Sequence, residues 1–424
     1  MMTVFQDEST AISQSDAGEI TAPLSGLCVF ELSTYVAGPS CGVTLAQLGA
    51  EVIRIDPIGG ATDIRRLPLD RNGDSLYWAG LNQAKRSVEI DTSSSRGRDL
   101  VCKMLATSGK GGGILLTNSV GQDWLSYDNL AKYRADLIQI HIEGRSDGKP
   151  AVDYTINCEV GLPLITGPPE TDRPVNHVLP AWDLLTGLHA AIGILSAERV
   201  RSLTGRGQFM AISLADVAVA TMGHLGFLSD VTLNGRGRLR DGNYLYGSFG
   251  CDFRSKDGRQ VMIVALTERQ WQSLIKLTAT GEVIAALENT IGVDLTVEEV
   301  RYQYREVLVG LFRPWFEQRD FTEIVELLDA NRVLWGPYRT LEGLINDGGS
   351  LLNVSPIIDM VERPGIGTYP SPRGVLRHKD WPGQRAMQAP RLGQDTYSVL
   401  AQKLNLNDQD IAKLQAEGIV GGIL

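Results

Sequence analysis

Asp183 is the residue of this sequence whose surroundings most clearly favour covalent chemistry. It follows Pro180 and opens an apolar run that reaches Leu195. Because a charged carboxylate is seldom placed against apolar surface without a partner or a function, Asp183 is a candidate nucleophile toward an activated acyl group. The alternative is structural, since aspartate is a favoured N-cap and a helix would begin just after Pro180. Taken alone, the local sequence favours the cap, so the nucleophile needs support from other parts of the chain.

The other chemistry-bearing motifs point to ordinary structure. The glycine-rich segment 109–113 follows a predicted helix and precedes a strand, which is the reverse of a P-loop, so we predict a surface turn there. The first strand leads into Gly38, which is only one of the glycines that a dinucleotide fingerprint needs. The histidines are not spaced as metal ligands, and no serine stands in a GxSxG elbow. The motifs therefore predict no NAD site, no metal site and no hydrolase triad.

The composition indicates a globular protein of two domains. Its 424 residues are 43% hydrophobic, which is enough for a large core. The formal net charge of −10 argues against broad binding to nucleic acid or to an anionic membrane surface. Its five cysteines are widely spaced, and no stretch is apolar enough for a bilayer span or a secretory signal. We therefore predict a cytoplasmic protein that binds neither nucleic acid nor membrane.

Strands and helices alternate in the predicted secondary structure of the first part of the chain. Buried strands are expected at 28–32, 51–55, 87–90, 114–117 and 137–140, with helices at 42–48 and 97–105. This order is typical of an α/β protein with a mainly parallel, doubly wound sheet. Ligands of such sheets usually bind beyond the carboxyl ends of the strands.

The second part of the chain changes composition at residues 233–238, which are basic and glycine-rich. We interpret this segment as a linker between domains. Before it we expect an apolar helix from Asp183 to about Arg199, a strand at 209–214 and a helix at 215–228. After it we expect a strand at 260–266 and helices at 271–277, 296–312 and 408–415. Thr296 and Glu299 have the spacing of a capping box, which favours a helix start at that point.

A series of motifs is spread over nearly the whole chain from Leu24 onward. They are 32–33 with 37–39, 45–57, Asp63 with Arg66, Asn82, 85–87, Asp91, Asn118, Asp183 with Gly187 and 193–195, 204–208, and 389–395. In this order they resemble the family III CoA-transferases, the group that contains formyl-CoA:oxalate and carnitine CoA-transferases. Each motif is weak alone, but together they raise Asp183 from a predicted cap to a predicted nucleophile, and one residue can serve as both.

The resemblance implies a fold and an oligomeric state. It implies a large Rossmann-like domain, a smaller central α+β domain, and an interlocked homodimer in which each subunit threads through a ring made by the other. We accordingly divide the chain into a flexible extension (1–23), a large CoA-binding domain with the nucleophile (24–232), a linker and small domain (233–370) and a C-terminal segment that returns to the large domain (371–424). The expected ligand is an acyl-CoA substrate, with no cofactor beyond CoA itself and no metal.

The resemblance also assigns residues to CoA binding. The matching positions are Tyr35, Val36, Ala37, Ile90 and Asn118. The sequence departs from the formyl-CoA enzyme where that enzyme contacts CoA with Gln, Arg and Lys, since Val36, Pro57, Ser93 and Glu143 stand at those positions. The 3′-phosphate of CoA must then meet other cations, for which we name Arg54, Lys85 and Arg145.

A narrower set of motifs is similar to family members that move CoA within one molecule. The motifs are 56–60, 78–82, 176–183, 242–247 and 362–367. Those members transfer CoA between the C1 and C4 carboxyls of mesaconyl-CoA, in the 3-hydroxypropionate route of carbon fixation. We therefore predict that Asp183 carries first an anhydride and then a CoA thioester, and that a cation not identified by the sequence orients the distal carboxylate. Gly247, Ser248 and Gly250 are assigned to the loop that stabilises the oxyanions.

Three alternatives stay open at this point. An intermolecular transferase would share every motif but accept a separate carboxylic acid. A related α-methylacyl-CoA racemase would pair Asp183 with a histidine, but Tyr154 stands where that histidine is expected. A non-catalytic CoA-binding protein would bind acyl-CoA without forming a covalent adduct.

Overall fold

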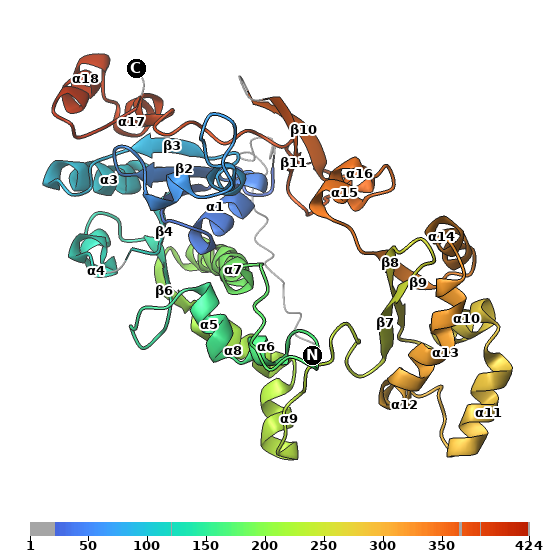
Figure 1. Ribbon diagram of the computed structural model, residues 1–424. Coiled ribbons are helices and arrows are strands. Elements are labelled where there is room, and N and C mark those ends of the chain that lie inside the picture. Colours follow the sequence, from blue (N-terminus) through green and yellow to red (C-terminus); the bar gives the residue numbers. More distant parts are fainter. Residues whose placement is uncertain (1–21, 120, 364–366, 382, 423–424) are drawn as a thin grey trace, which may run out of the picture. The chain divides into compact units, whose positions relative to one another are not determined.

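The computed structural model describes residues 22–119, 121–363, 367–381 and 383–422 (Figure 1). Nearly all of the predicted N-terminal extension, 1–23, lies outside the described residues. The chain forms two compact units, which we call unit 1 and unit 2. Unit 1 contains the described residues up to Ile156, then 180–219, and the chain from Pro356 onward; unit 2 contains 157–179 and 220–355.

Unit 1 is built on a parallel sheet of six strands in the order β3-β2-β1-β4-β5-β6. The strands are β1 (Cys28–Leu32), β2 (Glu51–Asp56), β3 (Arg86–Glu89), β4 (Ile114–Thr117), β5 (Ile138–Glu143) and β6 (Gln208–Ser213). Strands β1 and β4 are buried along their whole length, as expected for strands covered on both faces. The sheet confirms the predicted doubly wound α/β fold. Its order reverses between β1 and β4, where ligands of such sheets bind.

Two groups of helices pack against this sheet. The first group is α3 (Ser95–Thr107), α17 (Thr396–Leu404) and α18 (Asp408–Ala416), whose apolar side chains share one core with the strands. The second group is α1 (Ala37–Gln47) and α7 (Ala181–Thr204), which lie side by side (Figure 1). The two helices touch closely at Gly187, because a Cβ there would lie 2.0 Å from Ser40 Oγ and 2.6 Å from the Ala37 carbonyl oxygen.

Shorter elements complete unit 1. A two-stranded antiparallel hairpin is formed by β10 (Ile358–Arg363) and β11 (Gly367–Pro372). Short helical turns follow several strands of the sheet, namely η2 (Thr62–Arg65), α2 (Leu76–Leu81), η3 (Asp123–Leu125), α4 (Tyr127–Leu130) and α5 (Asp153–Glu159), the last of which continues into unit 2. These turns matter for the site, because they hold the loops at the carboxyl ends of the strands.

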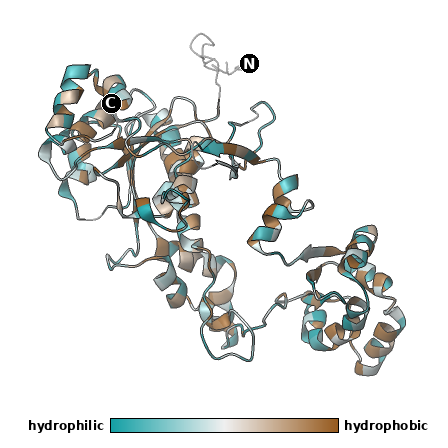
Figure 2. Ribbon diagram, turned by 45° about the horizontal axis from the view of Figure 1, so that its top comes forward, coloured by the Kyte–Doolittle hydropathy of each residue, from teal (hydrophilic) through white to brown (hydrophobic). Residues whose placement is uncertain are grey.

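Unit 2 has an antiparallel sheet and its own aromatic core. The sheet is formed by β7 (Phe249–Arg254), β8 (Gln260–Ala265) and β9 (Leu334–Pro337). In the core, the ring centroid of Phe249 lies 5.6 Å from that of Trp271 and 5.4 Å from that of Phe312. Figure 2 shows that the helices of unit 2 carry both hydrophobic and hydrophilic residues. These helices are α6 (Leu162–Ile165), α8 (Leu214–His224, shared with unit 1), α9 (Phe227–Asn234), α10 (Glu268–Thr278), α11 (Gly281–Ile291), α12 (Glu298–Gln303), α13 (Arg305–Glu317), α14 (Phe321–Ala330), α15 (Leu341–Asn346) and α16 (Leu351–Val354).

Three predicted features of this half differ from the structure. The helix expected at 215–228 is broken at Gly226, which has a φ of 80°, and continues as α9. The helix expected at 296–312 is two helices, and its N-cap is Val297 rather than Thr296. The capping box lies instead at Thr267, whose hydroxyl accepts the Gln270 N–H while the Gln270 side chain accepts the Thr267 N–H.

The division into units also differs from the predicted boundaries at 232 and 370. The glycine-rich segment 233–238 begins where α9 ends, and the chain has already entered unit 2 at residue 220. The return to unit 1 comes at Pro356, before the β10–β11 hairpin. The glycine-rich composition of 233–238 reflects the end of a helix and not a domain boundary. Gly235 provides the left-handed C-cap of α9, with a φ of 70°.

The described residues hold neither a single helix suited to span a membrane nor a cluster of metal ligands. No single helix among them combines the length and apolar character of a membrane span, although the pair α8 and α9, bent by 60°, meets those criteria when taken together. Nor do three or more His, Cys, Asp or Glu side chains gather as metal ligands anywhere in that part of the chain.

Candidate active site

Asp183 lies in the first turn of α7, but it does not cap the helix. The N-cap position is Pro180, which offers no side-chain acceptor. The acceptor comes from Asp153 at the start of α5, whose Oδ2 accepts the backbone N–H of Trp182 at 2.7 Å and that of Asp183 at 3.1 Å. The prediction that Asp183 is the N-cap of this helix is therefore wrong. Since a different carboxylate fixes the start of the helix, that of Asp183 is not needed there.

The environment of Asp183 disfavours its charged form. The pKa of Asp183 is raised to about 7, first because burial disfavours the carboxylate and second because Asp153 is negative, while the positive charge of Arg66 lowers it. Asp153 is itself 2% exposed, so its charge is poorly screened by water. Near neutral pH a part of this carboxyl group is ionised, and the carboxylate is weakly solvated, which favours its use as a nucleophile.

Arg66 and two tyrosines form the neighbouring part of the site. The Arg66 guanidinium carbon lies 5.4 Å from the ring centroid of Tyr35 and 5.0 Å from that of Tyr77. The pKa of Tyr77 is raised, mainly by burial, and the negative charge of Asp183 adds to the shift while Arg66 opposes it. Tyr77 and Asp153 were not predicted as site residues, because nothing local to either residue in the sequence connects it with Asp183.

The structure brings the predicted CoA contacts at Tyr35, Val36, Ala37 and Asn118 together at the topological switch point. Asn118 Oδ1 accepts the Thr34 N–H at 3.2 Å, and Asn118 Nδ2 donates to the Thr34 carbonyl at 3.0 Å. These two bonds join the loops that follow β4 and β1. Tyr35 and Val36 then lead directly into α1, which packs on α7 at Gly187, one turn beyond Asp183.

Arg54 and Lys85 belong to a buried network of charges under this loop. Lys85 Nζ lies 2.8 Å from Glu31 Oε2, while Arg54 Nε lies 2.9 Å from Asp56 and its Nη2 lies 3.1 Å from Asp63. Arg54 is 1% exposed and Lys85 is 5% exposed. Burial and these ion pairs exclude both residues from a direct phosphate contact in this structure, which corrects their predicted role. Their observed contacts are with the carboxylates of β1, β2 and η2.

The network fixes the backbone at Tyr35. Asp63 Oδ2 accepts the Tyr35 N–H at 2.9 Å, and the same carboxylate binds Arg54. Tyr35 adopts a φ of 67°, a conformation that side chains other than glycine seldom adopt. The ion pairs of β2 thus hold the loop after β1 in the conformation that turns it toward α1.

The remaining predicted CoA contacts are placed differently. Ile90 is fully buried in the core of unit 1 and its backbone pairs with Val420, so its side chain packs against other apolar residues. Arg145 follows β5 and its guanidinium donates to both oxygens of Asp147 at 3.1 Å. The burial of Ile90 does not support a contact with CoA. The guanidinium of Arg145 is partly engaged by the neighbouring carboxylate of Asp147.

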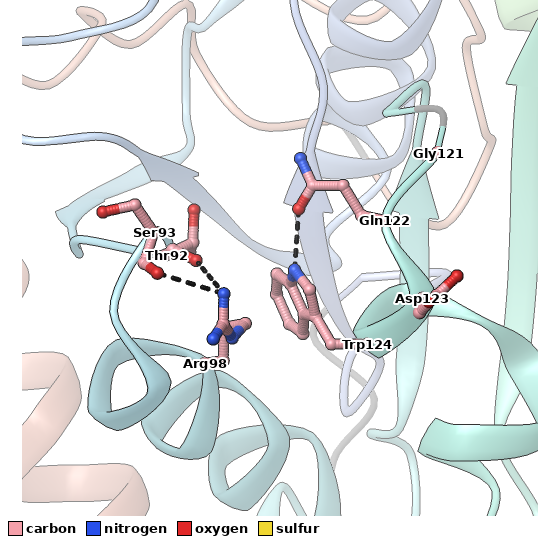
Figure 3. Close-up of a pocket in the computed structure, with 7 residues that line it drawn as sticks. All are labelled: Thr92, Ser93, Arg98, Gly121, Gln122, Asp123 and Trp124. Atoms are coloured by element: carbon pink, nitrogen blue, oxygen red, sulfur yellow. Dashed lines mark hydrogen bonds between the residues drawn. The ribbon is translucent and has the colours of Figure 1, made fainter.

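A pocket of about 600 Å³ lies among the loops after β3 and β4 (Figure 3). Arg98 donates to the carbonyl oxygens of Thr92 and Ser93 at 3.5 and 3.0 Å, and the Trp124 indole N–H donates to Gln122 Oε1 at 2.7 Å. Figure 3 shows the side chains of Arg98, from α3, and Trp124, from η3, near each other at this pocket. Neither residue was predicted as a site residue, because a lone arginine in a helix and a lone tryptophan after a strand carry no motif.

The residues assigned to the oxyanion loop lie in unit 2, in a tight turn before β7. The Leu245 N–H donates to the Gly250 carbonyl at 2.9 Å, and Gly247 has a φ of 79°. A Cβ at Gly250 would lie 2.8 Å from Leu245 Cβ, so the turn requires glycine there. Ser248 is buried and donates weakly to the Ala265 carbonyl at 3.4 Å. The role of this turn toward Asp183 stays a prediction.

Comparisons with known proteins agree with this geometry. The model of CoA-transferase family III matches residues 24–396. The chain is 45% identical over 400 residues to a protein named 2-methylfumaryl-CoA isomerase from Chloroflexus aurantiacus, covering 94% of this chain and 98% of that one. It is 25% identical over 419 residues to the human succinyl-CoA:glutarate CoA-transferase, covering 97% and 92%. A CaiB/BaiF family protein from Brucella suis shares the fold, with a TM-score of 0.74 at 24% identity over 90% of this chain and all of that one.

Proposed function

Because the chain belongs to the family III CoA-transferases, we propose that it moves CoA between the C1 and C4 carboxyls of mesaconyl-CoA within one substrate molecule. The observation that carries the proposal is Asp183, a carboxylate with a pKa of about 7 that is not used as a helix cap. The relative named 2-methylfumaryl-CoA isomerase supports the substrate, since mesaconyl-C1-CoA and 2-methylfumaryl-CoA are the same compound.

The first half of the reaction moves CoA onto the protein. The Asp183 carboxylate attacks the C1 thioester carbonyl, the carbon–sulfur bond breaks, and CoA leaves as a thiolate, which gives an aspartyl–mesaconate anhydride. The thiolate then attacks the Asp183 carbonyl carbon. Its bond to the mesaconate oxygen breaks, which leaves an aspartyl-CoA thioester and free mesaconate in the pocket.

The second half returns CoA to the other carboxyl. The C4 carboxylate of mesaconate attacks the aspartyl thioester, expels the thiolate and forms a second anhydride. The thiolate attacks the C4 carbonyl, and the Asp183 carboxylate leaves in its original form. Each attack creates an oxyanion, and we assign its stabilisation to N–H groups of the turn at Gly247, Ser248 and Gly250. Atoms and charges balance without any further reactant.

We assign the adenosine end of CoA to the pocket of Arg98 and Trp124. Arg98 binds only backbone carbonyls among the described residues, so its positive charge is available to a phosphate. The Trp124 indole offers an aromatic surface on which an adenine ring stacks. This pocket replaces Arg54 and Lys85 as the expected phosphate site. The interlocked homodimer and the cytoplasmic location remain part of the proposal on the strength of the family resemblance.

An intermolecular CoA-transferase is the second candidate function. The human relative, named as a succinyl-CoA:glutarate transferase, favours it, because its name states a transfer between two acids. The chemistry at Asp183 would be the same, but mesaconate would leave the pocket and a different acid would take CoA.

Incubation of the purified protein with mesaconyl-C1-CoA alone tests the proposal. We expect the C4 ester to form without any added acid and ¹³C-labelled free mesaconate to stay out of the product. Conversion only after a free acid is added would overturn the intramolecular reaction and support the second candidate. The Asp183→Ala variant is the control, and normal turnover by that variant would contradict the mechanism.

A further inference from the structure

We infer that Arg66 binds the substrate carboxylate that is not reacting at Asp183, and that it thereby selects dicarboxylic over monocarboxylic acyl groups. The inference deepens the proposed function and rests on it. It answers a question left by the sequence, namely which cation orients the distal carboxylate.

The guanidinium of Arg66 is exposed and forms no ion pair with any carboxylate among the described residues. Its contacts are the faces of Tyr35 and Tyr77, at 5.4 and 5.0 Å from the ring centroids. Aromatic faces hold a guanidinium in place while leaving its N–H groups in the ring plane free to donate. One donor interacts with the Tyr77 hydroxyl, and a carboxylate ligand would find the remaining donors unoccupied by any carboxylate of the described residues.

The base of the Arg66 side chain is anchored rather than mobile. Its backbone N–H donates to the Asp63 carbonyl at 3.1 Å, and its own carbonyl accepts the Ser75 hydroxyl. Asp63 is part of the buried network through Arg54. The guanidinium is thus presented from a fixed backbone, as expected for a group that positions a ligand.

Arg66 and Asp183 lie close enough for their charges to interact. The Tyr35 hydroxyl lies 3.1 Å from that of Thr62, which holds the η2 loop against the loop that enters α1. From there α1 packs on α7 at Gly187, one turn from the nucleophile. Electrostatics agree with this placement, since the positive charge of Arg66 lowers the pKa of Asp183 against the effects of burial and Asp153.

One such cation serves both halves of the reaction. The two carboxyls of mesaconate are joined by a single carbon–carbon double bond, so when one is at Asp183 the other lies only a few ångströms away. After CoA moves to Asp183, the mesaconate must turn so that its C4 carboxylate reacts. In each orientation Arg66 binds the carboxylate that is not reacting, which keeps the dianion in the pocket between half-reactions.

The other cations of the site do not compete for this role. Arg54 and Lys85 are buried in ion pairs, and we have assigned Arg98 to the phosphate pocket. Arg65, next in the chain, is exposed and stacks on no aromatic ring in the described structure. It therefore offers a matched control, because Arg65→Gln removes the same charge from the same loop.

The test compares two CoA esters with the same carbon skeleton. Tiglyl-CoA has a methyl group where mesaconyl-C1-CoA has its distal carboxylate. Single-turnover formation of the Asp183 adduct is followed by rapid quenching and mass spectrometry. At a pH well above the pKa of Asp183, where its carboxylate is ionised in every variant, we expect Arg66→Gln to slow adduct formation from mesaconyl-C1-CoA by about 100-fold, the cost of leaving a buried substrate charge unpaired, and to leave the tiglyl-CoA rate unchanged. Arg66→Lys should restore part of the preference, and Arg65→Gln should alter neither rate.

The outcomes separate the inference from the proposed function. If the wild-type protein fails to isomerise mesaconyl-C1-CoA, the proposed function falls and the inference with it. If the wild type isomerises its substrate but Arg66→Gln slows both esters equally, with a shifted pH profile, Arg66 acts only on the charge of Asp183 and the inference is wrong. Equal rates for wild type and Arg66→Gln would overturn it as well. Thermal unfolding of each variant checks that the fold is retained.

Discussion

Unit 1 contains two clusters of charged side chains that differ in how their charges are matched. In the buried network, Glu31, Asp56 and Asp63 each contact Arg54 or Lys85 within ion-pair distance. At the site, Asp183 and Asp153 lie near each other, and the nearby cation Arg66 forms an ion pair with neither in the described structure. The paired charges of the buried network hold the backbone at Tyr35 in place. The charges at Asp183 and Arg66 have no ion-pair partner in the described structure, and we assign them to the substrate. The first cluster holds the loop that the second one uses.

The largest effect expected is the loss of activity on removing the nucleophile. Asp183→Ala should lower isomerisation by about 10⁴-fold or more, because no other group can carry the CoA thioester. Its free energy of unfolding should not fall at pH values above the pKa of Asp183. The folded protein binds a proton at Asp183 more tightly than the unfolded chain does, so this residue destabilises the fold as pH rises from 3.8 to about 7, and the full penalty is present above that pH. Activity assays and thermal unfolding measure both; a variant that is inactive because it is unfolded would not support the mechanism.

The next effect is on stability, from breaking the matched network. Lys85→Met should lower the free energy of unfolding by about 3–5 kcal/mol, because Glu31 keeps a buried charge with less compensation. Lys403→Met is the control, since Lys403 also pairs with a glutamate, Glu51 at 2.5 Å, but both side chains are partly exposed. That variant should lose about 1 kcal/mol or less. Urea unfolding of the two variants measures the difference, and equal losses would show that burial of the pair is not what matters.

A smaller effect should follow from separating α1 and α7. Gly187→Ala should lower the free energy of unfolding by about 1–3 kcal/mol, because its Cβ meets Ser40 and the α1 backbone. Gly193→Ala lies on the same helix, where a Cβ would meet the end of the Ile140 side chain at 3.1 Å. A flexible side chain can move aside, so this variant should change stability less. The same two variants should differ in activity, since only Gly187 sets the distance from α7 to the β1 loop.

The smallest effect expected is a change in pH dependence. In the wild type, kcat/KM should rise with pH through about 7, because the nucleophile must be ionised. Asp153→Asn keeps an oxygen acceptor for the first N–H groups of α7 but removes the negative charge. The inflection should therefore move to lower pH while staying above the usual aspartate value, since burial is the larger cause. An unchanged or higher inflection would show that the two carboxylates do not interact.

Much of unit 1 was predictable because its signals are local in the sequence. Buried runs such as 28–32 and 114–117 are the observed strands β1 and β4. In unit 2, two local signals for the start of a helix were misread. Thr296 looked like a cap but is not one, while the real capping box at Thr267 and Gln270 was overlooked.

The site was less predictable, because its decisive contacts join distant segments. Asp153 takes over the cap of α7 from 30 residues upstream in sequence. Asp63 holds the N–H of Tyr35 across a separation of 28 residues. Arg54 and Lys85 looked like phosphate ligands, since a sequence cannot show which cations are already paired with buried carboxylates. Only the fold separates the matched charges from the unmatched ones.

The measurement that tests the central claim most directly is the mass of the protein during turnover. Wild-type protein is mixed with mesaconyl-C1-CoA, quenched in acid and analysed intact, and the modified peptide is then sequenced. We predict a CoA thioester on Asp183 that forms and decays as the C4 ester accumulates. Conversion of the substrate with no adduct, or with an adduct on another residue, would contradict the assignment of Asp183 as the group that carries CoA.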